Sequence, residues 1–417
     1  MTLTPCAPPV VTTSDADGSP VSGWTAPGFE PVRAAFENNF RAGTELGAAC
    51  AVYVDGTRVV DLWGGFRDRA RREAWQSDTV VPVFSTTKGM SSVALAVAHS
   101  RGLFDYDAPV ADYWPEFAQN GKDRVTVRQL LAHQAGLAAI DAPVTLQTAR
   151  DLDALAVAIG PQRPAWQPGT RHGYHGMTIG FYEGELLRRI DPLRRSLGRY
   201  FQEEVAAPFK ASFWIGLPAD IPEARVAQLQ GFRPAAMLLH LNSLPPGMVL
   251  AVMNPRSLTA RALNPLHLRR PDELFLPENR DIEFGAGGGI GEPRAIAQIY
   301  GDLATGGRAL GLCTKTLSAL AGPARPPTQG PRDVILHTDT SFSLGFWKPF
   351  RTFWFGGHAG GAFGTPGVGG SFGFADPAVG LGFAYAPNRM GFRLWDDRRE
   401  KRVRDAVYQC VTERRVR

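Results

Sequence analysis

The chain has 417 residues, of which 44% are hydrophobic and 20% charged, a balance typical of a soluble globular protein with a large core. Its net charge is +5, but the positive residues are scattered along the chain. Scattered charge favours solvated helix faces over a surface for nucleic acid. No run of about 18 apolar residues is present, so no membrane-spanning helix is predicted.

The first residues, 1–27, are rich in Pro, Thr, Ser and Gly and predict a loose N-terminal arm. They lack the basic and apolar regions of a signal peptide, so a cytoplasmic location is expected. The four cysteines lie far apart without CxxC spacing: Cys6, Cys50, Cys313 and Cys410. This pattern predicts neither a zinc site nor a disulfide framework.

The segment after the arm carries clear helix and strand signals. Apolar residues at helical spacing predict a helix over 30–41. Residues 47–66 hold two apolar, β-branched runs separated by Asp55-Gly56, a strong signal for a β-hairpin. Residues 85–100 open with Ser and Thr and then become rich in Ala, Val and Leu, which predicts a buried helix.

The second half of the chain changes character near residue 278. Residues 105–275 read mostly as helices and loops. Residues 294–307 predict a helix that ends at a Gly pair, as a C-cap would. Three short strand-like runs and a last helix follow, at 341–347, 371–377, 380–388 and 397–413.

Strands at both chain ends around a helical middle predict an α+β fold. We expect one antiparallel β-sheet, formed from both chain ends and flanked by helices, with a mainly α-helical region inserted. The corresponding domains are an α/β domain of residues 28–104 and 278–417, and a helical domain of residues 105–277 that walls the functional site.

The motif Ser85-x-x-Lys88 lies at the start of the predicted buried helix. Residues three positions apart share one helix face. A buried lysine can lose its proton and activate a serine hydroxyl, which is a poor nucleophile by itself. The backbone N–H groups at the helix start also favour developing negative charge. The alternative interpretation is that Ser85 or a neighbour caps the helix and that Lys88 is solvated.

Further segments extend this motif. The set comprises residues 83–90, 130–137, 172–189, 195–209 and 361–390. In their order and spacing, over about residues 30–410, these segments closely resemble the family VIII carboxylesterases, serine esterases of the class C β-lactamase fold. The resemblance implies that Ser85 is the nucleophile and Lys88 its base, with Tyr174 as the tyrosine of the Tyr-x-Asn motif. Gly176 replaces the Asn of that motif, which weakens the case for efficient β-lactam hydrolysis.

The family's third motif, on a strand beside the nucleophile, has two candidates here. Thr365-Pro366-Gly367 fits by position, because the glycine-rich continuation follows it directly; His358-Ala359-Gly360 fits by composition. Position is favoured, so the resemblance implies an oxyanion hole formed by the N–H groups of Val368 and Ser85. His358 would then lie in a nearby loop that lines the pocket.

Three other patterns compete with this site. Residues 369–373 match the G-x-S-x-G nucleophile elbow around Ser371, but the hairpin-like residues that follow do not fit its strand–turn–helix context. Residues 285–291 fail the G-x-G-x-x-G phosphate motif and predict a turn beside the pocket. His133, His172 and His175 lack metal-ligand spacing, so no metal is predicted. His175, next to Tyr174, either lines the site or makes a structural hydrogen bond.

The sequence therefore predicts a serine carboxylic-ester hydrolase that acts through an acyl-enzyme on small to medium-chain esters. No cofactor is needed, and neither nucleic acid nor a membrane is an expected partner. Alternatives with the same Ser–Lys–Tyr site are a β-lactamase, a D-amino-acid peptidase and an acyltransferase. A ligand-binding protein without catalysis is a further alternative. Residues 234–255 are rich in Met and Leu, which fits either a pocket wall or ordinary core packing.

Overall fold

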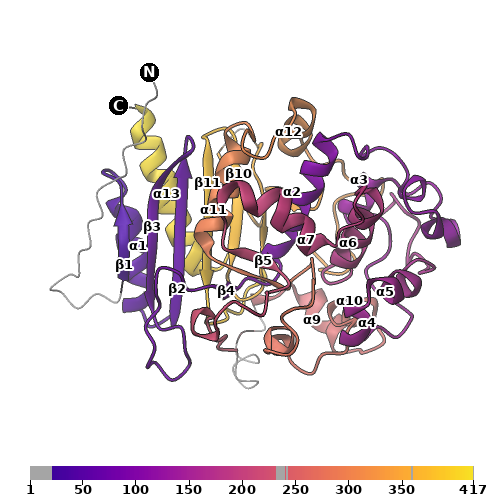
Figure 1. Ribbon diagram of the computed structural model, residues 1–417, viewed down its shortest axis with the longest axis horizontal. Coiled ribbons are helices and arrows are strands. Elements are labelled where there is room, and N and C mark those ends of the chain that lie inside the picture. The colour runs from indigo at the N-terminus through magenta and orange to yellow at the C-terminus, as the bar shows by residue number, and fades with distance from the viewer. Residues whose placement is uncertain (1–20, 232–239, 241–242, 358–359, 417) are drawn as a thin grey trace.

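The computed structural model describes residues 21–231, 240, 243–357 and 360–416, and every structural statement below concerns these residues (Figure 1). Its largest feature is an eight-stranded antiparallel sheet of order β1-β3-β2-β11-β10-β9-β8-β7. The strands are β1 Val21–Thr25, β2 Gly47–Val54, β3 Thr57–Gly65, β7 Phe342–Ser343, β8 Phe346–Trp347, β9 Phe363–Pro366, β10 Phe372–Asp376 and β11 Leu381–Pro387.

The sheet joins the two ends of the chain, as predicted. Strand β2 pairs with β11 along its length, for example Val52 opposite Phe383. Figure 1 shows the indigo N-terminal strands beside the yellow C-terminal ones. The β2–β3 hairpin turns at Asp55 and Gly56, both of positive φ (49° and 77°), as the primed hairpin turns require. The predicted α+β fold is thereby confirmed.

The prediction of a loose arm over residues 1–27 is wrong for Val21–Thr25. Within 1–27, Val21–Thr25 forms the edge strand β1, which pairs with β3 in register from Val21–Gly64 to Thr25–Val60. The Arg58 guanidinium lies 5.4 Å from the Trp24 ring centroid and adds a cation–π contact. A five-residue strand interrupted by Gly23 carries too little pattern to be recognised. Residues 1–20 lie outside the described residues.

Helices cover both faces of the sheet. α1 Glu30–Arg41 and α13 Arg398–Val416 pack together on one face, and α11 Pro293–Ala304 packs on β2, β10 and β11 from the other. The alternation along β2 follows these faces, because Ala51 and Tyr53 belong to the core cluster on the α11 side whereas Cys50 and Val52 belong to the opposite one. A Cβ on Gly382 would collide with the α11 backbone, so this glycine allows the close approach.

The predicted buried helix is α2, Thr86–Ser100, and all but its last residue are buried. The chain enters it from a second, three-stranded sheet of order β4-β6-β5. These strands are β4 Val81–Pro82, β6 Gly289–Gly291 and β5 Phe213–Ile215. The small sheet therefore ties the entry of α2 to segments more than a hundred residues away.

The middle of the chain consists of short helices and loops beside α2. The α-helices are α3 Val127–Leu131, α4 Leu146–Arg150, α5 Leu152–Ile159, α6 Ile179–Ile190, α7 Leu197–Phe201, α9 Pro246–Val252, α10 Leu258–Leu263 and, after the middle region, α12 Thr314–Ala321. Short 3-10 or π turns lie at Val110–Asp112, Pro115–Gly121, Gln202–Ala206, Ala207–Phe209, Glu223–Arg225 and Pro271–Phe275. In the described part of the chain, no helix has the length and apolar character to cross a membrane. The boundaries of the two predicted domains stay a prediction.

Candidate active site

Ser85 directly precedes the first turn of α2, and the residue before it has a strained backbone. Phe84 has a φ of 47°, a left-handed conformation that is costly for a bulky side chain. Ser85 itself is half-buried, and its side chain makes no capping hydrogen bond to the helix. The alternative interpretation of Ser85 as a helix cap is therefore wrong, and its hydroxyl is free for another partner.

That partner is Lys88. Its Nζ lies 2.8 Å from Ser85 Oγ and donates a 2.6 Å hydrogen bond to the carbonyl oxygen of Ala286. The side chain is buried, and burial lowers the pKa of Lys88 from 10.5 to about 7. A solvated Lys88, the second half of the alternative, is thus also excluded. At neutral pH a large fraction of this amine is free to accept a proton.

Tyr174 lies beside the same amine. Lys88 Nζ is 5.2 Å from the centroid of the Tyr174 ring, which stacks on Phe342 at 5.7 Å. Burial raises the pKa of Tyr174 to about 12, and the neighbouring Ser85 hydroxyl acts in the opposite direction by hydrogen bonding. Tyr174 is therefore a neutral phenol at neutral pH, a proton carrier more than a base. The structure brings Ser85, Lys88 and Tyr174 together.

The end of β9 approaches Ser85 from the sheet. A Cβ on Gly367 would collide with the Val83 carbonyl, so the end of β9 lies against the backbone two residues before Ser85. Val368 packs against Phe84 in a small apolar cluster. Within the described residues, neither the Ser85 nor the Val368 backbone N–H makes a hydrogen bond. Two such donors beside a nucleophile are what an oxyanion hole requires.

Thr365 was predicted to face the pocket as the first residue of the third motif, but its side chain points toward α2. It is fully buried, and a Cβ on Gly89 would lie 3.2 Å from its Oγ1, so its side chain supports α2 from beneath. The reason is the alternation of β9, where Thr365 pairs with Gly373 on the face that the helix covers. The other candidate for the third motif, His358, lies outside the described residues.

His175 is a structural residue and does not line the site. It is fully buried, its Nε2 accepts a 2.8 Å hydrogen bond from the Leu137 N–H, and its Nδ1 lies 2.6 Å from the Gly173 carbonyl oxygen. Burial lowers the pKa of His175 to about 3, so the ring is neutral. Both nitrogens are used by the backbone, which fits the structural half of the prediction.

The two other motifs also have structural roles. Ser371 Oγ donates to the Val83 carbonyl oxygen at 2.7 Å and lies 3.0 Å from Thr86 Oγ1. A strand follows it, not a helix, so it is no nucleophile elbow. The glycine-rich segment 285–291 wraps around α2, where its carbonyl groups accept hydrogen bonds from Lys88 and Ser91. In the described ranges, no cluster of three or more metal-ligating side chains is found.

Several residues that hold the site were not predicted. The buried Asp333 carboxylate accepts a 2.9 Å hydrogen bond from the Tyr174 N–H. Arg399, buried with Glu45 and Asp397, donates a 2.7 Å hydrogen bond to the Gly369 carbonyl oxygen, next to Val368. These contacts join segments 30 to 159 positions apart, so no local pattern reveals them.

An apolar cluster lies around the residue before Ser85. Phe84, Leu229 and Met390 form a buried cluster, against which Phe275 and Val368 pack. The rings of Phe84 and Phe275 meet edge-on at 5.0 Å. These side chains come from distant parts of the chain and pack around Phe84, the residue before Ser85.

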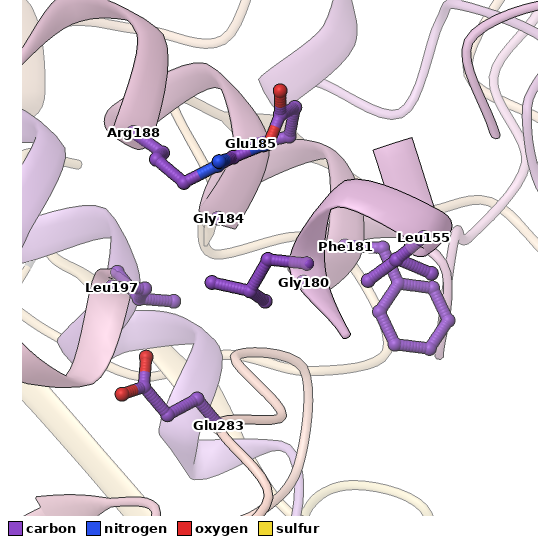
Figure 2. Close-up of a pocket in the computed structure, with 9 residues that line it drawn as sticks. Leu155, Gly180, Phe181, Gly184, Glu185, Arg188, Leu197 and Glu283 are labelled. Atoms are coloured by element: carbon purple, nitrogen blue, oxygen red, sulfur yellow. The ribbon is translucent and has the colours of Figure 1, made fainter. Parts of the chain in front are cut away.

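A small cavity elsewhere has no share in this site. Figure 2 shows it between α5, α6 and α7, with Leu155, Phe181 and Leu197 around it and the Arg188–Glu185 pair at one side. None of Ser85, Lys88 or Tyr174 lines it. It is a small void between helices.

The fold and the buried Ser-x-x-Lys helix define a protein of the serine β-lactamase fold. The family model described as Beta-lactamase matches residues 36–407, and the chain belongs to this family. It is 32% identical to the esterase/beta-lactamase LipL of Mycobacterium tuberculosis over 398 residues, 89% of this chain and 84% of that protein. The resemblance found in the sequence is thereby confirmed.

Solved structures agree. A family VIII carboxylesterase has a TM-score of 0.80 and 36% identity, covering 94% of this chain and 99% of the other. A penicillin-binding protein homologue from Caulobacter crescentus has a TM-score of 0.79 and 34% identity, over 94% and 99%. The similar proteins thus include both an esterase and a penicillin-binding protein homologue.

Proposed function

We propose that this protein is a serine carboxylesterase that hydrolyses small to medium-chain carboxylic esters through an acyl-enzyme on Ser85. The broader class, a carboxylic-ester hydrolase, is the one that the names of similar proteins support. The observation that carries the mechanism is the 2.8 Å contact between Ser85 Oγ and a buried Lys88 amine of lowered pKa. Such an amine can take the serine proton at neutral pH.

In the proposed acylation, Lys88 Nζ accepts the Ser85 proton while Oγ attacks the ester carbonyl carbon. The carbonyl oxygen becomes an oxyanion, which the Ser85 and Val368 N–H groups stabilise. As the intermediate collapses, the C–O bond to the alcohol breaks, and the Lys88 proton reaches the leaving oxygen through the Tyr174 hydroxyl. Water then repeats the sequence on the acyl-enzyme and releases the acid.

The substrate class follows from the surroundings of Ser85. The cluster of Phe84, Leu229 and Met390 offers apolar contact to an acyl or alcohol chain. Gly176 offers no side-chain amide beside Tyr174, where a β-lactamase of this fold has Asn to hold the substrate amide. These two features favour an ester with apolar groups over a β-lactam or a peptide. An acyltransferase would use the same residues, with an alcohol in place of water.

The test compares p-nitrophenyl acetate, butyrate and octanoate with the β-lactam nitrocefin for the wild-type protein and Ser85→Ala. We expect turnover of the esters, slow or no turnover of nitrocefin, and a loss of about 1,000-fold or more in kcat in Ser85→Ala. A wild-type protein without ester turnover would refute the function. Ester turnover that survives Ser85→Ala but is lost in Ser371→Ala would refute the site.

A further inference from the structure

A second cavity, with a volume of about 260 Å³, is lined by residues that the proposed mechanism does not use. Three segments form its walls: the residues that lead into α9, the loop that follows Asp333, and the segment 393–395 before α13. These segments are far apart in the sequence, so the cavity is a product of the fold.

Two separate sets of contacts join the cavity walls to Tyr174. Trp395 packs on Trp347 with the ring centroids 5.4 Å apart, and Trp347 packs on the Tyr174 ring at the same distance. Asp333, whose carboxylate accepts a hydrogen bond from the Tyr174 N–H, also donates its own N–H to the Thr338 carbonyl oxygen at 2.8 Å. Because Trp395 and Thr338 both line the cavity, the cavity lies on the Tyr174 side of the candidate site.

A third connection leads from the cavity to the residue before the proposed nucleophile. Met390 packs with Phe84, which directly precedes Ser85. Arg393, three residues after Met390, lines the cavity. Three residues of chain span at most about 10 Å. A substrate held at Ser85 therefore has the cavity within its reach.

The lining combines an apolar wall, hydroxyl groups and one positive charge. Burial lowers the pKa of His337, so this lining residue is neutral at neutral pH. Arg393 is then the one charged side chain among the described lining residues, and no described Asp or Glu lines the cavity. The apolar wall consists of Pro245, Pro246, Leu394 and Trp395, and the hydroxyl groups belong to Ser243, Thr338 and Thr352.

The charge of Arg393 is not neutralised by its neighbours. Arg393 is half-buried and forms no ion pair with a described residue. The two acids that follow it are paired with other arginines, Asp396 with Arg404 at 2.5 Å and Asp397 with Arg399 at 2.9 Å. A guanidinium group offers several donors in a plane that matches a carboxylate. Arg393 thus gives the cavity the donors and the charge that a bound carboxylate requires.

We propose that this cavity binds the alcohol part of the ester, and that Arg393 favours alcohols that carry a carboxylate group. This inference rests on the proposed function, in which Tyr174 delivers the proton to the leaving oxygen. The alcohol part then lies on the Tyr174 side of the scissile bond, where the cavity is. The body of the alcohol contacts the apolar wall, and its carboxylate binds Arg393. The substrates are accordingly esters of hydroxycarboxylic acids.

The test compares two esters of nearly the same shape. 4-Acetoxybenzoate releases an alcohol that carries a carboxylate, whereas 4-acetoxybenzamide releases its neutral analogue. The variant is Arg393→Met, and Arg351→Met is the matched control. Arg351 is exposed, carries the same charge and adjoins Thr352 of the lining, but it does not line the cavity itself.

For the wild type, kcat/KM should be about tenfold or more higher for the benzoate than for the benzamide, as expected for one charge-assisted contact. In Arg393→Met this ratio should fall to about one, mainly through a higher KM for the benzoate. The ratio in Arg351→Met should follow the wild type. A wild-type ratio of about one or less, a ratio that Arg393→Met leaves unchanged, or an equal fall in Arg351→Met would overturn the inference.

A binding measurement separates this inference from the proposed function. In isothermal titration calorimetry, the product 4-hydroxybenzoate should bind the wild type and bind Arg393→Met about tenfold more weakly. Absence of turnover for every ester would refute the proposed function, and the titration would still decide the role of Arg393, since equal binding to both proteins overturns it. A wild-type preference for mono-4-nitrophenyl glutarate over p-nitrophenyl butyrate that Arg393→Met removes would overturn the assignment of the cavity to the alcohol part.

Discussion

Replacing Glu183 by Gln should stabilise the protein, and the gain should depend on pH. The pKa of this carboxyl group is raised from 4.5 to about 8 by burial. At pH 7 it is protonated in the folded protein and ionised in the unfolded chain. Folding at pH 7 must therefore protonate a group whose pKa in the unfolded chain lies about 2.5 units below that pH. At 1.4 kcal/mol per unit, this costs about 3 kcal/mol. Below pH 4.5 the group is protonated in both states, and this cost is absent.

The assay is urea unfolding followed by tryptophan fluorescence, at about pH 4.5, about pH 7 and about pH 8. The free energy of unfolding of Glu183→Gln should equal that of the wild type at the lowest pH. It should exceed the wild-type value by about 3 kcal/mol at pH 7 and by slightly more at pH 8. Glu185→Gln, two residues along the same helix, loses ion pairs with Arg188 and Arg189 and should show no such gain. An advantage that is the same at every pH would refute the reasoning.

Three further substitutions distinguish residues proposed to act in catalysis from residues that hold the site in place. Tyr174→Phe keeps the stacked ring but removes the proton carrier, so kcat should fall by about 100-fold or more with the unfolding midpoint almost unchanged. Ser371→Ala should keep kcat within about threefold and lose about 1–2 kcal/mol in urea unfolding, because the Val83 carbonyl oxygen loses its donor. Arg399→Met should lower the free energy of unfolding by about 3–5 kcal/mol, since Glu45 and Asp397 lose their buried partner. It should also lower kcat, because the Gly369 carbonyl, next to the proposed oxyanion donor Val368, loses its hydrogen bond. A Ser371→Ala protein as inactive as Ser85→Ala would contradict the assignment of the nucleophile.

Local patterns were sufficient where neighbours in sequence decide the structure. Asp55 and Gly56 adopt the positive φ values that a hairpin turn requires, so the hairpin was predictable. The run after Ser85 is apolar on every face, which is typical of a helix enclosed by other elements, and α2 is such a helix. The Ser–Lys pair also follows from local spacing, because three positions along a helix set their side chains on one face.

The features that could not be predicted depend on packing between segments far apart in the sequence. The position of its motif predicts Thr365 as a site residue, but the side of the strand that it occupies follows from how β9 lies against α2. The helix α6 carries two carboxylates, Glu183 and Glu185, and no periodicity tells which of them is enclosed between two helices. Asp333 lies 159 residues from the loop that it holds. Contacts of this kind are settled by the three-dimensional arrangement of elements, which a single sequence does not display.

The pairing of β2 with β11 has a consequence for synthesis on the ribosome. Ser85, the proposed nucleophile, leaves the ribosome early, whereas strand β11, which pairs with β2, ends at residue 387. The nascent chain therefore carries Ser85 for a long stretch of translation before Val368, the second proposed oxyanion donor, and the apolar cluster around Phe84 are complete. Pairing of segments so far apart is also slow to form. The protein should thus acquire catalytic competence late, after β11 has paired with β2, and a chain that stops before β11 should not hydrolyse an ester.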